Sequence, residues 1–102
     1  MVTTPAQGSI ILLEHRYFMI ISRDYFNRTE QVIACPVIPD QNSYPSPVHR
    51  VINEPVKGTV FCEQMRYFDL SRRHYQVIRE VPVEDLMEVS DIVQGLVEYQ
   101  LY

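Results

Sequence analysis

The first part of the chain alternates short apolar runs with polar breaks, a pattern typical of β-strands. Residues 9–14 and 17–22 are almost continuously apolar. Only His15 and Arg16 separate these two runs, so we expect a β-hairpin with a very short connection. We expect a third strand over residues 31–38.

The rest of the chain predicts three more strands and one helix. The strands are expected over residues 49–53, 59–66 and 74–79, after a polar loop with three prolines at 39–47. Apolar side chains recur at clear helical spacing only over residues 83–101, with acidic residues on the opposite face and in the first turn. This pattern predicts a single amphipathic helix at the C-terminal end.

These elements predict a mainly β protein with a C-terminal helix. Five or six short strands that close around one core, with the helix packed outside, suggest a small barrel; a split α+β sheet is the alternative. Pro36 lacks a backbone N–H, so we expect it at a sheet edge or a bulge. One helix is too few for a doubly wound fold. A length of 102 residues suits one domain, residues 1–102.

Composition narrows the classes of function. With 46% hydrophobic and 22% charged residues, the chain is globular rather than disordered. The net charge of −4 opposes nucleic-acid binding, but the acidic residues are concentrated near one end. Residues 80–102 hold six of the 13 acids and no Lys or Arg. Residues 1–79 are therefore slightly basic, and a polyanion can approach them.

Membranes, metals and cofactors have no signal in the sequence. No apolar run is long enough to span a membrane and no secretory signal opens the chain, so we expect a cytoplasmic protein. Cys35 and Cys62 lie in apolar segments without the spacing of a zinc site, and we expect reduced, buried thiols. With three glycines in all, the chain has no phosphate-binding glycine loop. We therefore expect no metal and no cofactor.

The strongest chemical signal lies in residues 57–66, where a glycine turn and an apolar run lead into Glu-Gln-Met-Arg. An acid and a guanidinium are the groups that move a proton and bind a phosphodiester. Glu63 is the candidate base for a ribose 2′-hydroxyl. Arg66 and Arg16 are candidate phosphate ligands, because one guanidinium can bind two phosphate oxygens. The structural alternative for Glu63 is an ion pair with Arg66 at a strand end.

Four further residues are candidates for the same chemistry. His15 is the candidate for a second proton carrier. Gln64, His49 and Arg50 are candidates for contacts with RNA or its phosphates, the last two because they follow the proline loop. For His15 and Arg50 the alternative is a solvated surface side chain.

Five segments, in order along the chain, also carry a family pattern. They are residues 8–11 (Gly-Ser-Ile-Ile), 16–27 (Arg-Tyr-Phe-Met-Ile-Ile-Ser-Arg-Asp-Tyr-Phe-Asn), 32–37 (Val-Ile-Ala-Cys-Pro-Val), 58–66 (Gly-Thr-Val-Phe-Cys-Glu-Gln-Met-Arg) and 79–82 (Arg-Glu-Val-Pro). The third and fourth segments are similar to Val-x-x-Cys-Pro-x and Gly-x-Val-x-x-Asp-Gln-x-Arg. Together the five resemble the MazF/PemK (Kid) family of toxin–antitoxin ribonucleases over almost the whole chain.

The resemblance implies an SH3-like barrel of the MazF/PemK/CcdB type, a homodimer, a cognate antitoxin and metal-independent cleavage of single-stranded RNA. It assigns a functional role to Arg16 and places Glu63 where some members have a catalytic aspartate. The chain departs from the family at three places. The long first loop is reduced to about His15 and Arg16, Ile38 stands where members usually have a catalytic threonine, and Phe61 replaces an arginine.

Two classes of function follow from these observations. The first is a toxin-type endoribonuclease with a rearranged site, in which His15, Arg16 and Glu63 carry general acid–base attack by the ribose 2′-hydroxyl. The second is a non-catalytic barrel that binds a protein, as the CcdB-like gyrase poisons do, or RNA. The preserved carboxylate and arginines favour the enzyme, whereas the two apolar replacements and the short loop favour the binding module.

Overall fold

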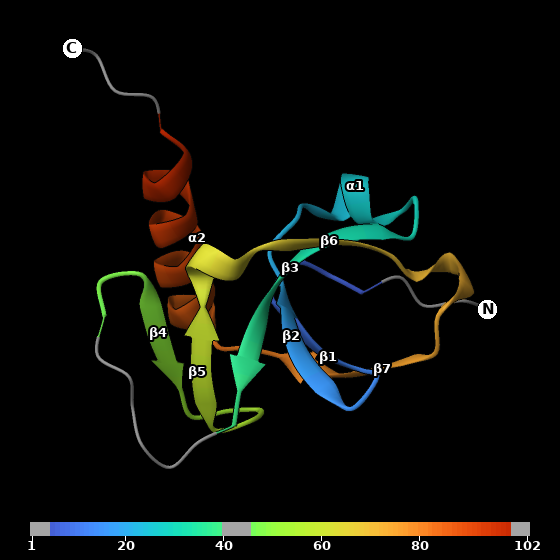
Figure 1. Cartoon of the computed structure of the whole chain (residues 1–102), viewed down its shortest axis with the longest axis horizontal. Helices are drawn as coiled ribbons and strands as arrows, with labels where there is room; N and C mark the ends of the chain where they lie inside the picture. The colour runs from blue at the N-terminus through green and yellow to red at the C-terminus, as the bar shows by residue number, and fades with distance from the viewer. Residues whose placement is uncertain (1–4, 40–45, 99–102) are drawn as a thin grey trace.

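The computed structural model of the chain describes residues 5–39 and 46–98 (Figure 1). In chain order its elements are β1 (Ser9–Leu13), β2 (Arg16–Ile20), α1 (Asp24–Asn27), β3 (Gln31–Ile38), β4 (His49–Ile52), β5 (Gly58–Phe61), the 3-10 turn η1 (Cys62–Gln64), β6 (Arg66–Asp69), the 3-10 turn η2 (Leu70–Arg72), β7 (Tyr75–Glu80) and α2 (Val83–Val97). None of the described helices has the length and apolarity needed to cross a membrane.

The strands form one antiparallel sheet in the order β4-β5-β3-β2-β1-β7, and β6 pairs with β3 as well. The sheet curls into a barrel-like shape without closing, and α2 lies beside β4 and η1 at one end (Figure 1). The predicted fold class, mainly β with a C-terminal helix, is confirmed. The helix begins at Val83 as expected and ends at Val97; residues 99–102, like 40–45 of the predicted loop, lie outside the described residues.

Two apolar clusters, rather than the single predicted core, hold this sheet together. Successive side chains of a strand point to opposite faces. Ile10 and Met19 belong to a cluster that α2 covers, with Val89 of the helix buried in it. Ile11 and Phe18 belong to a second cluster, against which β6 and β7 also pack. Both faces of β1 and β2 are therefore buried, which is why apolar and polar residues do not alternate along these strands.

The clusters predict unequal effects of side-chain truncation. Ile10 is 0% exposed, whereas Leu96, which helical spacing places on the apolar face of α2, is 41% exposed. We expect Ile10→Ala to lower the free energy of unfolding by about 2–5 kcal/mol and Leu96→Ala by less than about 1 kcal/mol. Urea unfolding of the two variants measures both values. An equal loss would show that Leu96 is covered in solution.

The β1–β2 connection lies one residue earlier than the sequence suggests. Glu14 and His15 form the turn, with φ of 52° and 67°, and such positive values characterise two-residue hairpin turns that match the strand twist. Leu13 pairs with Arg16, so Arg16 is the first residue of β2 rather than part of the turn. The register of the sheet therefore fixes where Arg16 lies.

The predicted strand over residues 59–66 is wrong in its middle, where η1 interrupts it. β5 ends at Phe61 and β6 begins at Arg66. The intervening 3-10 turn leaves Glu63 and Gln64 exposed. The acid and the amide thus avoid the cost of burial that a continuous strand in the sheet would impose.

The same interruption explains Pro36, which lies inside the sheet and not at its edge. β2 pairs with β3 along one side, including Pro36 opposite Phe18. Along the other side, the pairing with β6 ends at Ala34 and the pairing with β5 begins at Val37. Proline is tolerated here because the second ladder is broken beside it.

Both cysteines are buried free thiols, and they predict a loss of stability at high pH. Burial, with smaller contributions from Cys62 and Glu63, raises the pKa of Cys35 to about 12; burial and Glu63 raise the pKa of Cys62 to about 11. In the unfolded chain these thiols ionise near pH 9, so the unfolded state binds fewer protons between pH 9 and the folded pKa.

Each thiol should therefore lower the free energy of unfolding by about 1.4 kcal/mol per pH unit in that window. Urea unfolding between about pH 9 and 11 measures this slope. We expect Cys35→Ala to show a clearly smaller slope, and an unchanged slope would contradict the assignment.

Candidate functional site

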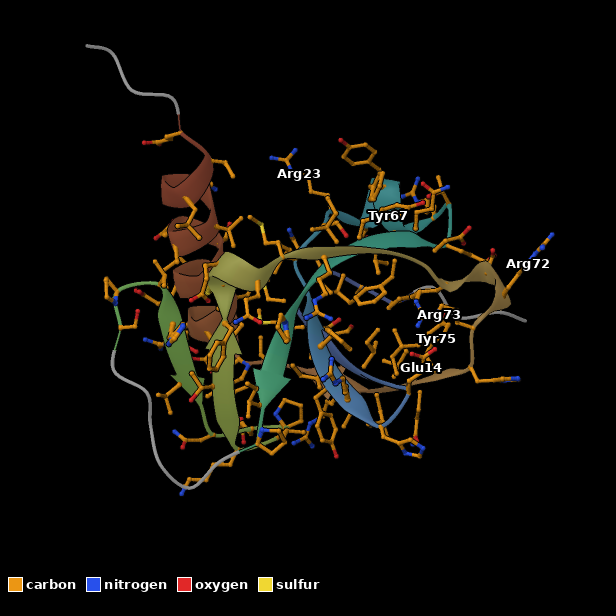
Figure 2. All side chains as sticks on the ribbon, in the orientation of Figure 1. Glu14, Arg23, Tyr67, Arg72, Arg73 and Tyr75 are labelled. Atoms are coloured by element: carbon orange, nitrogen blue, oxygen red, sulfur yellow. The ribbon has the colours of Figure 1, made fainter. Side chains whose placement is uncertain are left out.

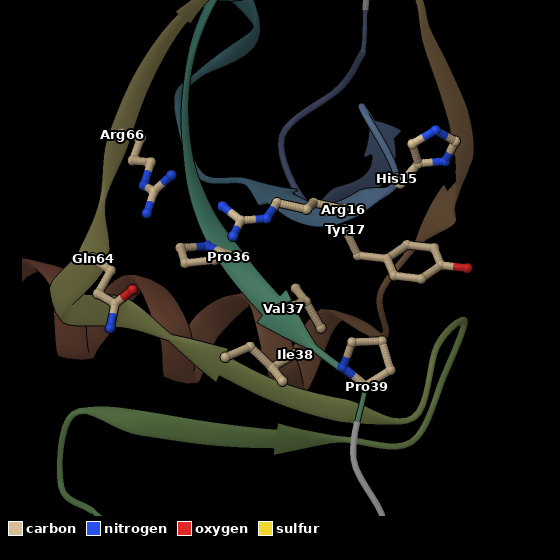
Figure 3. A pocket seen from close by; sticks show the side chains of 9 residues that line it. All are labelled: His15, Arg16, Tyr17, Pro36, Val37, Ile38, Pro39, Gln64 and Arg66. Atoms are coloured by element: carbon tan, nitrogen blue, oxygen red, sulfur yellow. The ribbon is translucent and has the colours of Figure 1, made fainter.

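A pocket of about 370 Å³ opens beside the broken ladder of β3 (Figure 3). Its polar lining comes from His15 at the hairpin turn, Arg16 of β2, Gln64 of η1 and Arg66 of β6. Its apolar lining comes from Tyr17 and residues 36–39. The fold therefore brings four of the seven candidate residues into one cavity.

Arg16 and Arg66 are the charged groups of this pocket. Their guanidinium groups extend toward the same space near Pro36 (Figure 3). Among the described residues, neither arginine makes an ion pair, and no acidic side chain lines the pocket. Two cations that face one space without a carboxylate favour an anion between them, and guanidinium groups suit the oxygens of a phosphate.

Glu63 binds His49 of β4 rather than Arg66, so the alternative ion pair considered from the sequence is wrong. His49 Nε2 lies 2.8 Å from Glu63 Oε2, with side-chain exposures of 12% and 36%. His49 is paired in register with Phe61 of β5, and their ring centroids are 4.1 Å apart. The imidazole is thus held by a carboxylate and by an aromatic ring, in an arrangement that can position and move a proton.

The turn η1 connects this histidine–carboxylate pair to the pocket. Glu63 and Gln64 are consecutive residues of η1, but Gln64 lines the pocket and Glu63 does not. The His49–Glu63 pair therefore lies next to the pocket of the two arginines, through η1, and not inside it.

Arg50 has a different position from the other candidates. Its Nη2 and Nε lie 2.9 Å and 3.0 Å from Oδ1 of Asp85 in α2. This ion pair joins β4 to α2. The helix covers the larger of the two apolar clusters, so the ion pair supports the packing of that cluster.

Sequence reasoning did not predict the pairing of His49 with Glu63 and Phe61. The pairing depends on the register of the β4–β5 hairpin, in which residue 49 lies opposite residue 61. Gly58 opens β5 and makes this placement possible, because a Cβ there would lie 2.6 Å from the carbonyl oxygen of Ile38. That glycine was the one local signal of a strand packed closely against its neighbour.

The described residues contain no group of three or more His, Cys, Asp or Glu side chains arranged to hold a metal ion.

Comparison with known proteins places the chain in a family. Residues 3–97 match the family described as "PemK-like, MazF-like toxin of type II toxin-antitoxin system". The chain belongs to this family. No curated protein sequence matches the chain.

Several solved structures share this fold. A crystal structure of MazE-MazF from Deinococcus radiodurans is 26% identical, with a TM-score of 0.80 over 93% of this chain and 97% of that chain. MazF alone from the same organism is 23% identical, with a TM-score of 0.80 over 94% and 98% of the two chains. A mycobacterial endoribonuclease in complex with its cognate antitoxin is 14% identical, with a TM-score of 0.78 over 94% and 99%. The predicted membership of the MazF/PemK family is confirmed.

The departures of this chain from the MazF/PemK pattern have clear positions in the structure. Ile38, where the resemblance places a catalytic threonine, is 41% exposed and lines the pocket. Phe61, where it places an arginine, stacks against His49. The first loop is the two-residue turn of Glu14 and His15. The apolar side chains thus shape the wall of the pocket and the support of His49.

Proposed function

We propose that this chain is a toxin-type endoribonuclease that cleaves single-stranded RNA without a metal. The observation that carries the proposal is the pocket of Arg16 and Arg66: the described residues that line it include two arginines and no acid, in a chain of net charge −4. A pocket that is basic in a chain of net negative charge is suited to an anionic ligand. In a MazF/PemK toxin, the phosphodiester of RNA is the ligand that this chemistry favours.

In the proposed reaction the scissile phosphate lies between Arg16 and Arg66. Glu63 lies outside the pocket, so the ribose extends past Gln64 to reach it; Glu63 takes the proton of the ribose 2′-hydroxyl, and the 2′-oxygen attacks phosphorus. The two guanidinium groups stabilise the negative charge of the phosphorane. His15, which lines the same pocket, gives a proton to the departing 5′-oxygen. The products are a 2′,3′-cyclic phosphate and a 5′-hydroxyl.

The remaining candidates have supporting roles in this proposal. His49 holds Glu63 through the 2.8 Å contact and fixes the direction of its carboxylate. Gln64 contacts the RNA from the wall of the pocket, where its amide offers both donors and an acceptor. Arg50 supports the packing of β4 on α2 through Asp85, so a role in RNA binding would compete with this ion pair.

Partners are also part of the proposal. One structure with this fold is a MazE-MazF complex, and another is a mycobacterial endoribonuclease in complex with its cognate antitoxin. By analogy we propose a cognate antitoxin for this chain, and we also propose a homodimer. Exposed apolar side chains on α2, among them Met87, Leu96 and Val97, give surface that a second protein can cover.

Incubation of the purified protein with a long single-stranded RNA in excess EDTA tests the proposed function. We expect discrete fragments that carry 5′-hydroxyl ends. Intact RNA beside a protein that circular dichroism shows to be folded would contradict it. That result would favour the non-catalytic binding module, for which the apolar Ile38 in the pocket wall is the structural argument.

A further inference from the structure

A second groove, of about 490 Å³, shares His15 with the first pocket. One side of the groove is the β1–β2 turn with Glu14 and His15, and the other is the segment from η2 to β7 with Arg72, Arg73 and His74. We call it the flanking groove. The proposed reaction uses no residue of this groove except His15.

The acidic side chain of the flanking groove is already neutralised. Glu14 Oε1 lies 2.6 Å from Nη2 of Arg73, and Figure 2 shows the two residues close together. The guanidinium of Arg73 also lies 5.3 Å from the ring centroid of Phe68. Arg73 is therefore engaged on two sides, and it joins the β1–β2 turn to the segment opposite.

Arg72 and His74 are the basic side chains left for a ligand. Both are exposed, and Arg72 projects away from the body of the protein (Figure 2). Among the described residues neither makes an ion pair. The nearby carboxylate of Asp69 accepts hydrogen bonds from the backbone N–H and hydroxyl of Ser71, at 3.0 Å and 2.7 Å. Those bonds, more than Arg72, lower the pKa of Asp69.

The charges of the two cavities differ from those of the whole chain. Among the described residues, four arginines and one acid line the two cavities, whereas the whole chain has nine Lys and Arg residues and 13 acids. That acid, Glu14, is paired. A single phosphate needs only the first pocket, so basic residues that continue past His15 indicate a ligand with several phosphates.

We propose that the flanking groove binds phosphates of the RNA next to the cleaved bond. The strand would pass from Arg16 and Arg66 over His15 to Arg72 and His74. This inference rests on the proposed ribonuclease function, and it names a binding site that extends the cleavage pocket on one side. RNA fits better than an acidic peptide because the two cavities meet at His15 and the first one is built for a phosphodiester.

Binding of uncleavable oligonucleotides tests the site. A short oligonucleotide spans the mapped cleavage position with a 2′-deoxy group there, and two longer ones add about four nucleotides on the 5′ or the 3′ side. We expect the extension on one side only to raise affinity about tenfold, because charge-assisted contacts are added there. The double variant Arg72→Gln/His74→Gln should lose this gain and keep the affinity for the short oligonucleotide.

Salt dependence and a control variant sharpen the test. For the longer oligonucleotide, the slope of log affinity against log salt should fall by about 0.7 for each phosphate contact that the variant loses. Arg79→Gln removes an exposed arginine of β7 that lines neither cavity, and it should change neither slope nor affinity. Thermal unfolding confirms that each variant is folded.

Two outcomes would overturn the inference, and they differ. If the double variant retains the gain from the longer strand, the flanking groove is not the site, although the first pocket still binds RNA. If wild-type protein binds neither the short nor the longer oligonucleotides and cuts no RNA, the proposed function itself has failed.

Discussion

Replacing Glu63 with glutamine should slow RNA cleavage by about 10²- to 10⁴-fold, the range expected for loss of a general base. Glutamine has nearly the same shape and can still form a hydrogen bond with His49, so we expect the 2.8 Å contact between the two side chains to be kept. The substitution removes only the ability of the side chain to take a proton. Single-turnover cleavage rates of the wild type and the variant measure the effect.

The matched control for Glu63→Gln is Glu88→Gln. Glu88 is an exposed acid of α2 and lies outside the candidate site. We expect this control to cut RNA at the wild-type rate. Full activity in Glu63→Gln would remove Glu63 from the mechanism. An equal loss in both variants would show that overall charge, and not the site, controls cleavage.

Replacing Arg16 with glutamine should lower the cleavage rate about 10²- to 10³-fold, as expected for removal of one group that stabilises transition-state charge. Arg16→Lys keeps the charge but loses bidentate binding of the phosphate. Its cleavage rate should therefore lie between those of the wild type and of Arg16→Gln. The melting temperature should not fall, because Arg16 makes no ion pair among the described residues and faces another cation, Arg66. Rates and thermal unfolding of the same preparations measure both properties.

Arg79→Gln is the control for charge in this series, since Arg79 lines neither cavity. A wild-type rate in Arg16→Gln would mean that the pocket is not the reaction site. A melting temperature lowered by several degrees would instead assign Arg16 a structural role that its surroundings do not indicate.

The sequence predicted those parts of the fold in which the local pattern of apolar residues matches the side chains that are buried in the structure. β1 and β2 are apolar on both faces because two clusters cover them, and this makes the runs at 9–14 and 17–22 unmistakable as buried strands. The start of α2 at Val83 follows from helical spacing and acidic residues in its first turn. Family membership followed from five motifs in the correct order.

The break in the strand over residues 59–66 could not be predicted in this way. Its residues have strand-forming character, but η1 forms because β5 and β6 pair with different parts of β3, on either side of Pro36. This is a property of the tertiary pairing, and it overrides local propensity. The exposure of Glu63 follows from the break.

The candidate site was predicted as a set of residues and not as an arrangement. Arg16 and Arg66 share a pocket because β2 and β6 both pair with β3. Glu63 contacts His49 because β4 and β5 form a hairpin in one particular register. Residue types indicated phosphodiester chemistry, whereas long-range strand pairing decided which groups meet.

In the proposed reaction a ribose 2′-hydroxyl attacks the phosphate bound by the pocket, and one chemical change to the substrate tests this step. After the cleaved bond has been mapped, an oligonucleotide with hydrogen in place of the single 2′-hydroxyl beside that bond is incubated with the protein in EDTA. We expect this bond to stay intact while the unmodified strand is cut. Cleavage of the modified bond at an unchanged rate would contradict it, because the nucleophile would then be a group other than the 2′-hydroxyl.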